Sequence, residues 1–353
     1  TAVQRPGRPS RSRAPAVLAI MALVVSVGVA VAAIVVDRSD RIEAARGRVL
    51  GAEPTTPLVS ARRVPRWTTE LTAQRSLAEA VAPLAATAPG TTCVGVGMGG
   101  ETIYSLNGTP SLTPASNQKL LTAAAALDIL GADTTLSTRF LAGGPPVDGV
   151  LTGDLWMVGG GDPVITTDAR AGGAGDTGRL QTDLESVADM LVALGITQVT
   201  GSVVGDDSRH DTARLLPGWP ERWLAGGTVA PLSALLVNDG WQVDPTTGEG
   251  PGGATPNPPA HAAVALTQLL AERGVQVVGA PSAGTAPASM EEVMAVASPT
   301  IGQLAQQLLT FSDNTTGELL LREIGLAVSG EGSSAAGAAA VAEWAVSYTH
   351  LRA

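Results

Sequence analysis

Ser116 and Lys119 are the two residues whose types and spacing point most directly to chemistry. They form a Ser-x-x-Lys motif, and Lys119 is the only lysine of the chain, since every other Lys or Arg position is arginine. Arginine does not lose its proton at physiological pH, whereas a desolvated lysine amine can do so and act as a base. A base beside a serine hydroxyl makes that hydroxyl a nucleophile. The pair predicts nucleophilic catalysis; the alternative is a solvated surface lysine that follows a serine by chance.

A helix is expected to position this pair. Thr113 is a candidate cap, Pro114 suits the first helical position, and strong helix formers continue to Leu127. Ser116 then falls in the first turn, near the positive end of the helix dipole. Lys119 follows three residues later and shares its face of the helix.

Three polar residues, Ser312, Asp313 and Asn314, lie between two further predicted helices, over 301–309 and 316–324. A loop between helices can present a hydroxyl and a carboxamide to a cleft without interrupting either helix. Ser312 could pass a proton between Lys119 and a leaving amine. The alternative is an ordinary helix cap.

Two stretches partly match nucleotide-binding motifs, but the residues around them do not fit such motifs. Gly95, Gly97 and Gly100 have the spacing of a dinucleotide-binding loop, but that loop must open a helix, and a hairpin of strands over 93–98 and 102–106 is predicted instead. Leu120 follows Lys119 at the position where a phosphate-binding loop needs serine or threonine.

Metal and histidine chemistry are not predicted either. Cys93 is the single cysteine, so an intrachain disulfide or a zinc site with several cysteines cannot form. The segment GDDSRHD (205–211) could offer ligands, but the neighbouring Arg209 opposes a cation and a solvated loop is expected. The three histidines lie near no Gly-x-Ser-x-Gly motif. We therefore predict no metal and no cofactor.

Charge and composition exclude nucleic acid as a partner. The chain has 353 residues, of which 44% are hydrophobic and 3% aromatic, enough apolar material for about two domains. Residues 1–75 hold 12 arginines against 5 acids, while the remainder holds 10 basic residues against 27 acids. Such an acidic body repels phosphate, and few aromatic side chains are present to stack on bases.

The basic N-terminal part has another explanation in residues 14–36, about 23 uncharged residues that approach the length needed to cross a bilayer. Four arginines precede this stretch, so the positive-inside rule places the N-terminus in the cytoplasm and everything after Asp37 outside. A cleaved signal peptide and a buried core helix are the alternatives. Residues 37–66, without apolar periodicity, are predicted to be a linker.

Small α/β layers are predicted in the middle of the chain. An apolar stripe from Leu180 to Leu194 predicts a helix that ends at Gly195, followed by a strand over 198–204. The stretches 264–274 and 275–278 repeat this order of helix and strand.

Ser-x-x-Lys followed by Ser-Asp-Asn is a motif set of penicillin-binding proteins and class A β-lactamases. Five segments extend this resemblance: PASNQKLLTAAAAL, GDLWMVGGGDPVI, GSVVGDDS, APLSALLVNDG and SDNTTGELLLREIG. With them, the chain resembles the class C low-molecular-mass penicillin-binding proteins, a D-alanyl-D-alanine carboxypeptidase/endopeptidase family, over about 77–325. The large separation of Ser116 and Ser312 agrees with that family and less well with the class A enzymes.

The resemblance implies an α+β fold, with a transpeptidase-like catalytic domain split by inserted α/β domains and preceded here by one transmembrane helix. It implies that Ser116 attacks the terminal D-Ala-D-Ala bond of a peptidoglycan stem peptide, with Lys119 as base. It also implies that Ser312 relays a proton, that Asn314 holds the substrate amide and orients Lys119, and that β-lactams acylate Ser116. The catalytic part is expected outside a bacterial cell membrane.

The sequence departs from the family in one respect. The family's third motif, Lys-Thr-Gly, is absent because Lys119 is the only lysine. The composition changes abruptly in the tail 346–353, and the sequence begins with Thr1 and not with methionine. We therefore expect a truncated chain that is not fully active. The alternative is a catalytically inactive, membrane-anchored module that binds the cell envelope. The predicted parts are a cytoplasmic tail (1–13), the anchor (14–36), the linker (37–66), a catalytic domain in two pieces (67–135 and 291–345), the insert (136–290) and a non-native tail (346–353).

Overall fold

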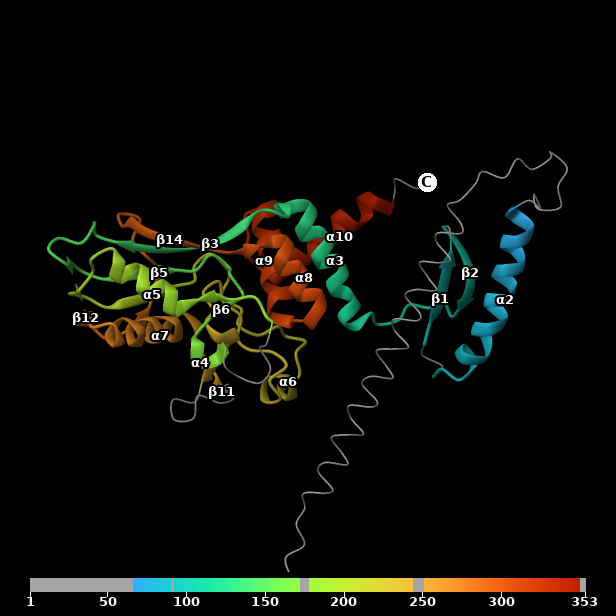
Figure 1. Cartoon of the computed structure of the whole chain (residues 1–353), viewed down its shortest axis with the longest axis horizontal. Helices are drawn as coiled ribbons and strands as arrows, with labels where there is room; N and C mark the ends of the chain where they lie inside the picture. Colours follow the sequence, from blue (N-terminus) through green and yellow to red (C-terminus); the bar gives the residue numbers. More distant parts are fainter. Residues whose placement is uncertain (1–65, 90–91, 99, 172–177, 244–250, 350–353) are drawn as a thin grey trace, which may run out of the picture. The chain divides into compact units, whose positions relative to one another are not determined.

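The computed structural model describes residues 66–89, 92–98, 100–171, 178–243 and 251–349 (Figure 1). The chain divides into two compact units, Thr1–Leu112 and Thr113–Ala353, which are described one at a time. The predicted anchor at 14–36 lies outside the described residues. Among the helices within them, none combines the length and apolar content that crossing a bilayer requires.

The first unit contains helix α2 (Arg66–Ala86) and the strands β1 (Val94–Met98) and β2 (Glu101–Leu106). The two strands pair antiparallel, Val94 opposite Leu106, which confirms the predicted hairpin. Gly100 turns the chain with a φ of 87°, a value that glycine adopts without strain. From the sequence, a helix over 68–82 that stops at Pro83 would be expected, but this end is wrong: Pro83 lies inside α2, close to its end, where a missing amide costs a single hydrogen bond.

The main sheet of the second unit has five strands in the order β13-β9-β5-β3-β14. The pairs β14–β3 and β3–β5 are antiparallel, whereas β5–β9 and β9–β13 are parallel. Both ends of the predicted insert therefore enter one sheet, although its division from a catalytic part stays a prediction. The strands are β3 (Thr135–Ala142), β5 (Leu155–Val158), β9 (Val203–Asp206), β13 (Ser282–Ala283) and β14 (Glu291–Thr300).

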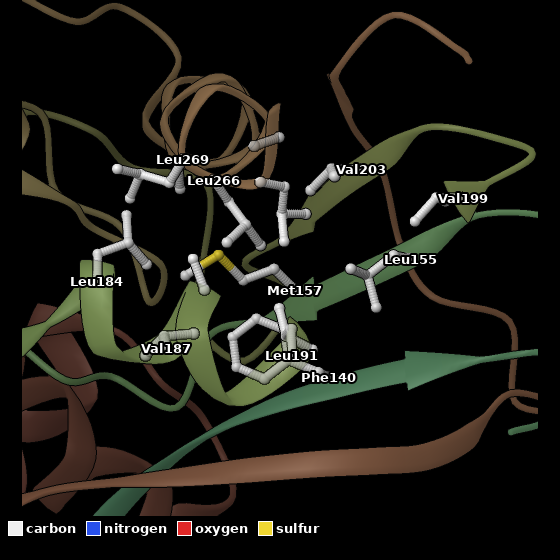
Figure 2. Close-up of a cluster of buried hydrophobic side chains, with 14 of the residues drawn as sticks. Phe140, Leu155, Met157, Leu184, Val187, Leu191, Val199, Val203, Leu266 and Leu269 are labelled. Atoms are coloured by element: carbon white, nitrogen blue, oxygen red, sulfur yellow. The ribbon is translucent and has the colours of Figure 1, made fainter. Parts of the chain in front are cut away.

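Two helices, α5 (Leu184–Ala193) and α7 (Pro258–Glu272), pack against each other and bury the apolar face of this sheet (Figure 2). Phe140 and Met157 from the strands meet Leu191 of α5 and Leu266 of α7, all of them almost completely buried. Burying a side chain of this size stabilises the fold by about 1.5–3 kcal/mol. The apolar side chains of the predicted α/β layers therefore form a buried core between this sheet and the two helices.

The predicted strand over 198–204 is wrong as a single element. It is two strands, β8 (Gln198–Val199) and β9, which belong to different sheets. Gly201 lies between the two strands, where its amide donates to Gly153 O at 2.8 Å. β8 lies between β4 (Val150–Leu151) and β12 (Gln276–Val277) in a small parallel sheet.

A cluster of four helices carries the predicted site residues. They are α3 (Gln118–Ala126), α8 (Ile301–Phe311), α9 (Asn314–Ser329) and α10 (Ser334–Thr349). A π-helical turn (Leu127–Gly131) extends α3, and a core that includes Ala126, Leu308 and Leu320 joins the helices. α10 continues beyond residue 345, where the predicted catalytic part ends, and the Tyr348 hydroxyl donates to Asp128 Oδ2 at 3.0 Å.

Short elements complete the second unit. They are β6 (Ile165–Thr166), α4 (Asp168–Ala171), β7 (Thr182–Asp183), α6 (Glu221–Ala225), the 3-10 turn η4 (Asn238–Gly240), β10 (Trp241–Val243) and β11 (Pro251–Ala254).

Candidate active site

Ser116 lies in a 3-10 turn (Ala115–Asn117) immediately before α3, and Lys119 lies in the first turn of α3. The Lys119 Nζ donates to Ser116 Oγ at 3.3 Å, so the structure brings the predicted nucleophile and base together. Ala115 has a φ of 48°, a left-handed conformation that is strained for a residue with a Cβ. Such strain is characteristic of functional turns.

The predicted cap at Thr113 is wrong. The residue that precedes the 3-10 turn is Pro114, and no side chain caps it. The left-handed Ala115 breaks the helical path before Ser116, and the 3-10 turn that contains Ser116 runs directly into α3.

The turn between α8 and α9 brings Ser312 and Asn314 to the same lysine. Lys119 Nζ is 2.7 Å from Asn314 Oδ1 and 3.4 Å from Ser312 Oγ. Ser312 ends α8 in a left-handed conformation, and the side chain of Asp313 caps α9 by accepting from the amide of Thr316 at 2.9 Å. The predicted position of this triplet between two helices is confirmed, with Asn314 as the first residue of α9.

Burial lowers the pKa of the Lys119 amine below its usual value of 10.5. The carboxylates of Asp313 and Glu318 act in the opposite direction but do not cancel the effect of burial. A lower pKa raises the fraction of neutral amine near pH 7, and only the neutral amine can accept a proton from Ser116.

Ser116, Lys119 and Asn314 line a cavity of about 730 Å³. This volume lies in the range of sites that enclose a small molecule or a short peptide segment. Its apolar walls come from α3, α9 and α10 and from two tryptophans beside and within α6: Leu121, Leu321, Val341, Trp219 and Trp223. The cavity therefore offers a polar end with a nucleophile and an apolar wall.

Residues of the α8–α9 turn line a second, smaller cavity of about 250 Å³. Asp239 lines it with a left-handed backbone, and its Oδ1 is buried without a hydrogen-bond partner. Burial, followed by the nearby negative charge of Asp313, raises the pKa of Asp239 to about 7. Arg179 pairs with Asp313 at 2.9 Å and lies over the Phe311 ring.

The segment GDDSRHD is not the solvated loop that we expected. Asp206 and His210 are buried, and His210 Nε2 lies 2.7 Å from Glu323 Oε1. Arg209 pairs with the same carboxylate at 2.6 Å. Burial favours protonation of Glu323, but the hydrogen bonds from Arg209 and His210 outweigh it and lower its pKa. Buried partners from α9, which lie far along the chain, explain the difference.

One group of three carboxylates with metal-ligand spacing occurs among the described residues, Asp168, Asp183 and Glu185. None of the three lines either cavity described above. Two of them already accept backbone hydrogen bonds, since Glu185 accepts from the Asp168 amide and Asp183 caps α5.

Sequence reasoning missed three participants in this region: Glu318, Asp239 and the tryptophan pair. Glu318 lies four residues after Asn314, a spacing that puts both on one face of a helix, so the signal was present but not used. Asp239 and the tryptophans carry no local signal, because folding alone brings them to the site.

The chain belongs to the D-Ala-D-Ala carboxypeptidase 3 (S13) family, whose sequence profile matches residues 74–256 and 252–351. This is the class C low-molecular-mass penicillin-binding protein family that the motifs indicated, so that prediction is confirmed. A D-alanyl-D-alanine carboxypeptidase of Actinomadura sp. (strain R39) is 27% identical over 311 residues, covering 69% of this chain and 55% of the relative. Carboxypeptidase Rv3627c of Mycobacterium tuberculosis is 30% identical over 222 residues, covering 62% of this chain and 44% of the relative.

The chain spans about half the length of these curated relatives. Among solved structures, penicillin binding protein 4 (dacB) from Haemophilus influenzae aligns with a TM-score of 0.55 at 20% identity, covering 69% of this chain and 64% of that one. This likeness confirms the predicted transpeptidase-like α+β fold.

Proposed function

We propose that this protein is a serine-type D-alanyl-D-alanine carboxypeptidase that binds penicillin at Ser116. The arrangement of Lys119 supports the proposal, because its amine lies within reach of Ser116 and Ser312 and is hydrogen-bonded to Asn314. Membership of a carboxypeptidase family adds support from an independent direction.

In the proposed reaction the neutral amine of Lys119 takes the proton of Ser116 as Oγ attacks the carbonyl carbon of the terminal D-Ala-D-Ala bond. The bond to the leaving nitrogen then breaks, and Ser312 passes a proton from Lys119 to that nitrogen, which releases D-alanine. Water afterwards attacks the ester on Ser116 and frees both the shortened peptide and the enzyme. Asn314 holds Lys119 in place and binds the substrate amide.

A β-lactam amide presents a similar carbonyl, so we propose that it acylates Ser116 and leaves slowly. The same chemistry on a peptidoglycan cross-link would be endopeptidase activity. Release of D-alanine from a pentapeptide and cleavage of a cross-linked dimer measure these two activities separately. Rapid loss of the penicilloyl group would instead indicate a β-lactamase.

The second candidate is an envelope-binding module of the same fold without catalysis. One observation favours it: the 353 residues contain no Lys-Thr-Gly, the motif that in the resembling family binds the substrate carboxylate. We accordingly propose that these residues alone, although they contain the nucleophile and base, are not fully active. Adding the third motif from a relative should then restore turnover.

Covalent labelling tests the proposed function. The whole gene product should become labelled by a fluorescent penicillin, with the mass increase on the peptide that contains Ser116, and Ser116→Ala should abolish the label because no nucleophile remains. Ser282→Ala is the matched control, since Ser282 is exposed on β13 and should leave labelling unchanged. Labelling that survives Ser116→Ala would contradict the assignment, and failure of the unaltered protein to label would favour the binding module.

We also propose that residues 14–36 anchor the protein in a bacterial membrane with the catalytic part outside the cytoplasm. The length of the apolar stretch and the four arginines before it support this proposal.

A further inference from the structure

Glu318 lies in the same cavity as the Ser116–Lys119 pair, although no motif points to it. The start of α9 lines this cavity with residues at intervals of three and four, which together form one face of the helix. These residues are Asn314, Gly317, Glu318 and Leu321. Glu318 is therefore a half-buried carboxylate one helical turn beyond the residue that binds the Lys119 amine.

The Lys119 side chain runs along this face of α9. A Cβ placed on Gly317 would lie 3.9 Å from Lys119 Cγ and 3.8 Å from Lys119 Cε, so the lysine stem packs directly over the glycine backbone. Glu318 lines the same cavity as Lys119, one helical turn after Asn314, and this places its carboxylate on the side of α9 that Lys119 contacts. The hydrogen bonds and ion pairs found among the described residues do not join Glu318 to Lys119, so the two groups interact through space.

A hydrogen-bonded chain holds the Glu318 carboxylate in place. Ser334, at the start of α10, donates from Oγ to Glu318 Oε2 at 2.9 Å, and Arg322 Nε donates to the same Ser334 Oγ at 3.3 Å. Arg322 is completely buried, its Nη1 lies 3.0 Å from Asp211 Oδ1, and its Nη2 donates to Ala213 O at 2.6 Å. Glu318 is thus fixed by α10 and by the loop after β9, and cannot simply turn into solvent.

Taking the proposed acylation as its basis, we propose that Glu318 is a positioning residue that acts through Lys119: its anchored carboxylate sets the balance between the ammonium and amine forms of the lysine beside Ser116.

The charges around Lys119 agree with this role. Burial lowers the pKa of Lys119, while Asp313 and Glu318 raise it. Burial raises the pKa of Glu318 above its usual value. The hydrogen bond from Ser334 and the positive charges of Arg322 and Lys119 act in the opposite direction. The ion pair with Arg179 partly neutralises Asp313, whereas the direct partner of Glu318 is a neutral hydroxyl. The side chains that α10 contributes to the cavity wall are apolar: Ala338, Val341, Ala342 and Ala345.

The single lysine permits a direct test that does not depend on enzyme activity. The chain of 353 residues, labelled with ¹³Cε-lysine and carrying no lysine in any tag, should give one lysine side-chain NMR signal. The chemical shift of this signal reports the charge of Lys119 during a pH titration. Glu318→Gln should lower the titration midpoint by roughly 0.5 pH units, because a nearby negative charge no longer favours the ammonium form. Glu318→Asp, which keeps the carboxylate, should lie closer to the unaltered protein.

Glu331→Gln is the matched control, because it removes the same charge at an exposed position where Glu331 also accepts from a serine, Ser333, at 2.7 Å. Coinciding midpoints for Glu318→Gln and Glu331→Gln would overturn the proposal. If Glu318→Gln does not fold, Lys119→Met tests the reciprocal effect. Loss of the ammonium should raise the titration midpoint of the Glu318 carboxyl, which ¹³C NMR measures. An unchanged Glu318 midpoint would equally overturn the proposal. If Ser116 proves not to be acylated, the proposed function fails while the NMR titration still reports on Glu318.

Discussion

The Lys119 amine lies 2.7 Å from Asn314, 3.3 Å from Ser116 and 3.4 Å from Ser312. A proton acceptor at this position must be able to exist uncharged, which a lysine in a half-buried site can do and an arginine cannot. Under the proposed mechanism this position requires a lysine, whereas every other Lys or Arg position is arginine. Charge alone would be satisfied by either residue, but proton transfer requires lysine.

Lys119→Arg is therefore expected to reduce the rate of penicillin acylation by about 10²–10⁴-fold, because the guanidinium retains its proton. In the unaltered protein the acylation rate should rise with pH as Lys119 loses its proton, and burial should place this rise below pH 10.5. The measurement is the acylation rate constant from pH 6 to 11. An arginine variant that acylates at the normal rate would show that Lys119 is not the base.

At the scale of the secondary-structure elements, the α8–α9 turn holds two of the four site residues. α8 begins with a capping box, in which Thr300 and Gln303 satisfy each other's backbone amides, and ends at the left-handed Ser312. Asp313 then caps α9. These two caps fix where the helices end and begin, and hence where the Ser312 hydroxyl and the Asn314 amide lie.

A destabilising group, the buried Oδ1 of Asp239, lines a cavity together with residues of this turn. Because the pKa of Asp239 is raised to about 7, the folded protein binds a proton that the unfolded chain releases between about pH 4 and pH 7. The free energy of unfolding should therefore fall as the pH rises through this range.

Asp239→Asn removes the ionisation and should raise the free energy of unfolding on the order of 1 kcal/mol at pH 8, with little gain at pH 4. Asparagine also tolerates the left-handed backbone of this position. Asp148→Asn is the control, because Asp148 has a φ of 49° but is exposed. Urea denaturation at both pH values measures the effect, and an equal gain at pH 4 and pH 8 would contradict this explanation.

At the scale of the whole molecule, a basic N-terminal part precedes an acidic body, with 12 arginines against 5 acids in residues 1–75 and 10 basic residues against 27 acids afterwards. Lysine and arginine before an apolar stretch keep that side of a membrane protein in the cytoplasm. The proposed anchor is thus consistent with where the basic residues lie.

The anchor predicts that the protein stays in the membrane fraction after a carbonate wash, and that deletion of residues 1–36 releases it. The physical reason is that about 23 apolar residues bury too much surface in the bilayer to leave it spontaneously. Mass spectrometry of the N-terminus distinguishes the alternatives. A released protein whose N-terminus begins after the apolar stretch would show that the stretch is a cleaved signal peptide.

Much of the local structure could be predicted because it depends on neighbours in the sequence. The β1–β2 hairpin follows from two short strands around a glycine pair, and the helices that flank Ser312 follow from their composition. Two of the errors occurred where distant contacts prevailed. The segment over 198–204 divides between two sheets at Gly201, and His210 is buried against Glu323, which is 113 residues away along the chain.

The relation between Ser116 and Lys119 was already contained in their spacing of three residues, since any helix or tight turn there brings the two side chains together. The sequence motif also identified Ser312 and Asn314 as candidates. Their short distances to Lys119, however, depend on the packing of α3 against α8 and α9, because residues about 195 positions apart come into contact only when the apolar faces of these helices pack together. The neighbourhoods of Glu318 and Asp239 arise in the same way. The reactive group is thus a local property of the chain, while the surroundings that set its charge are a property of the assembled core.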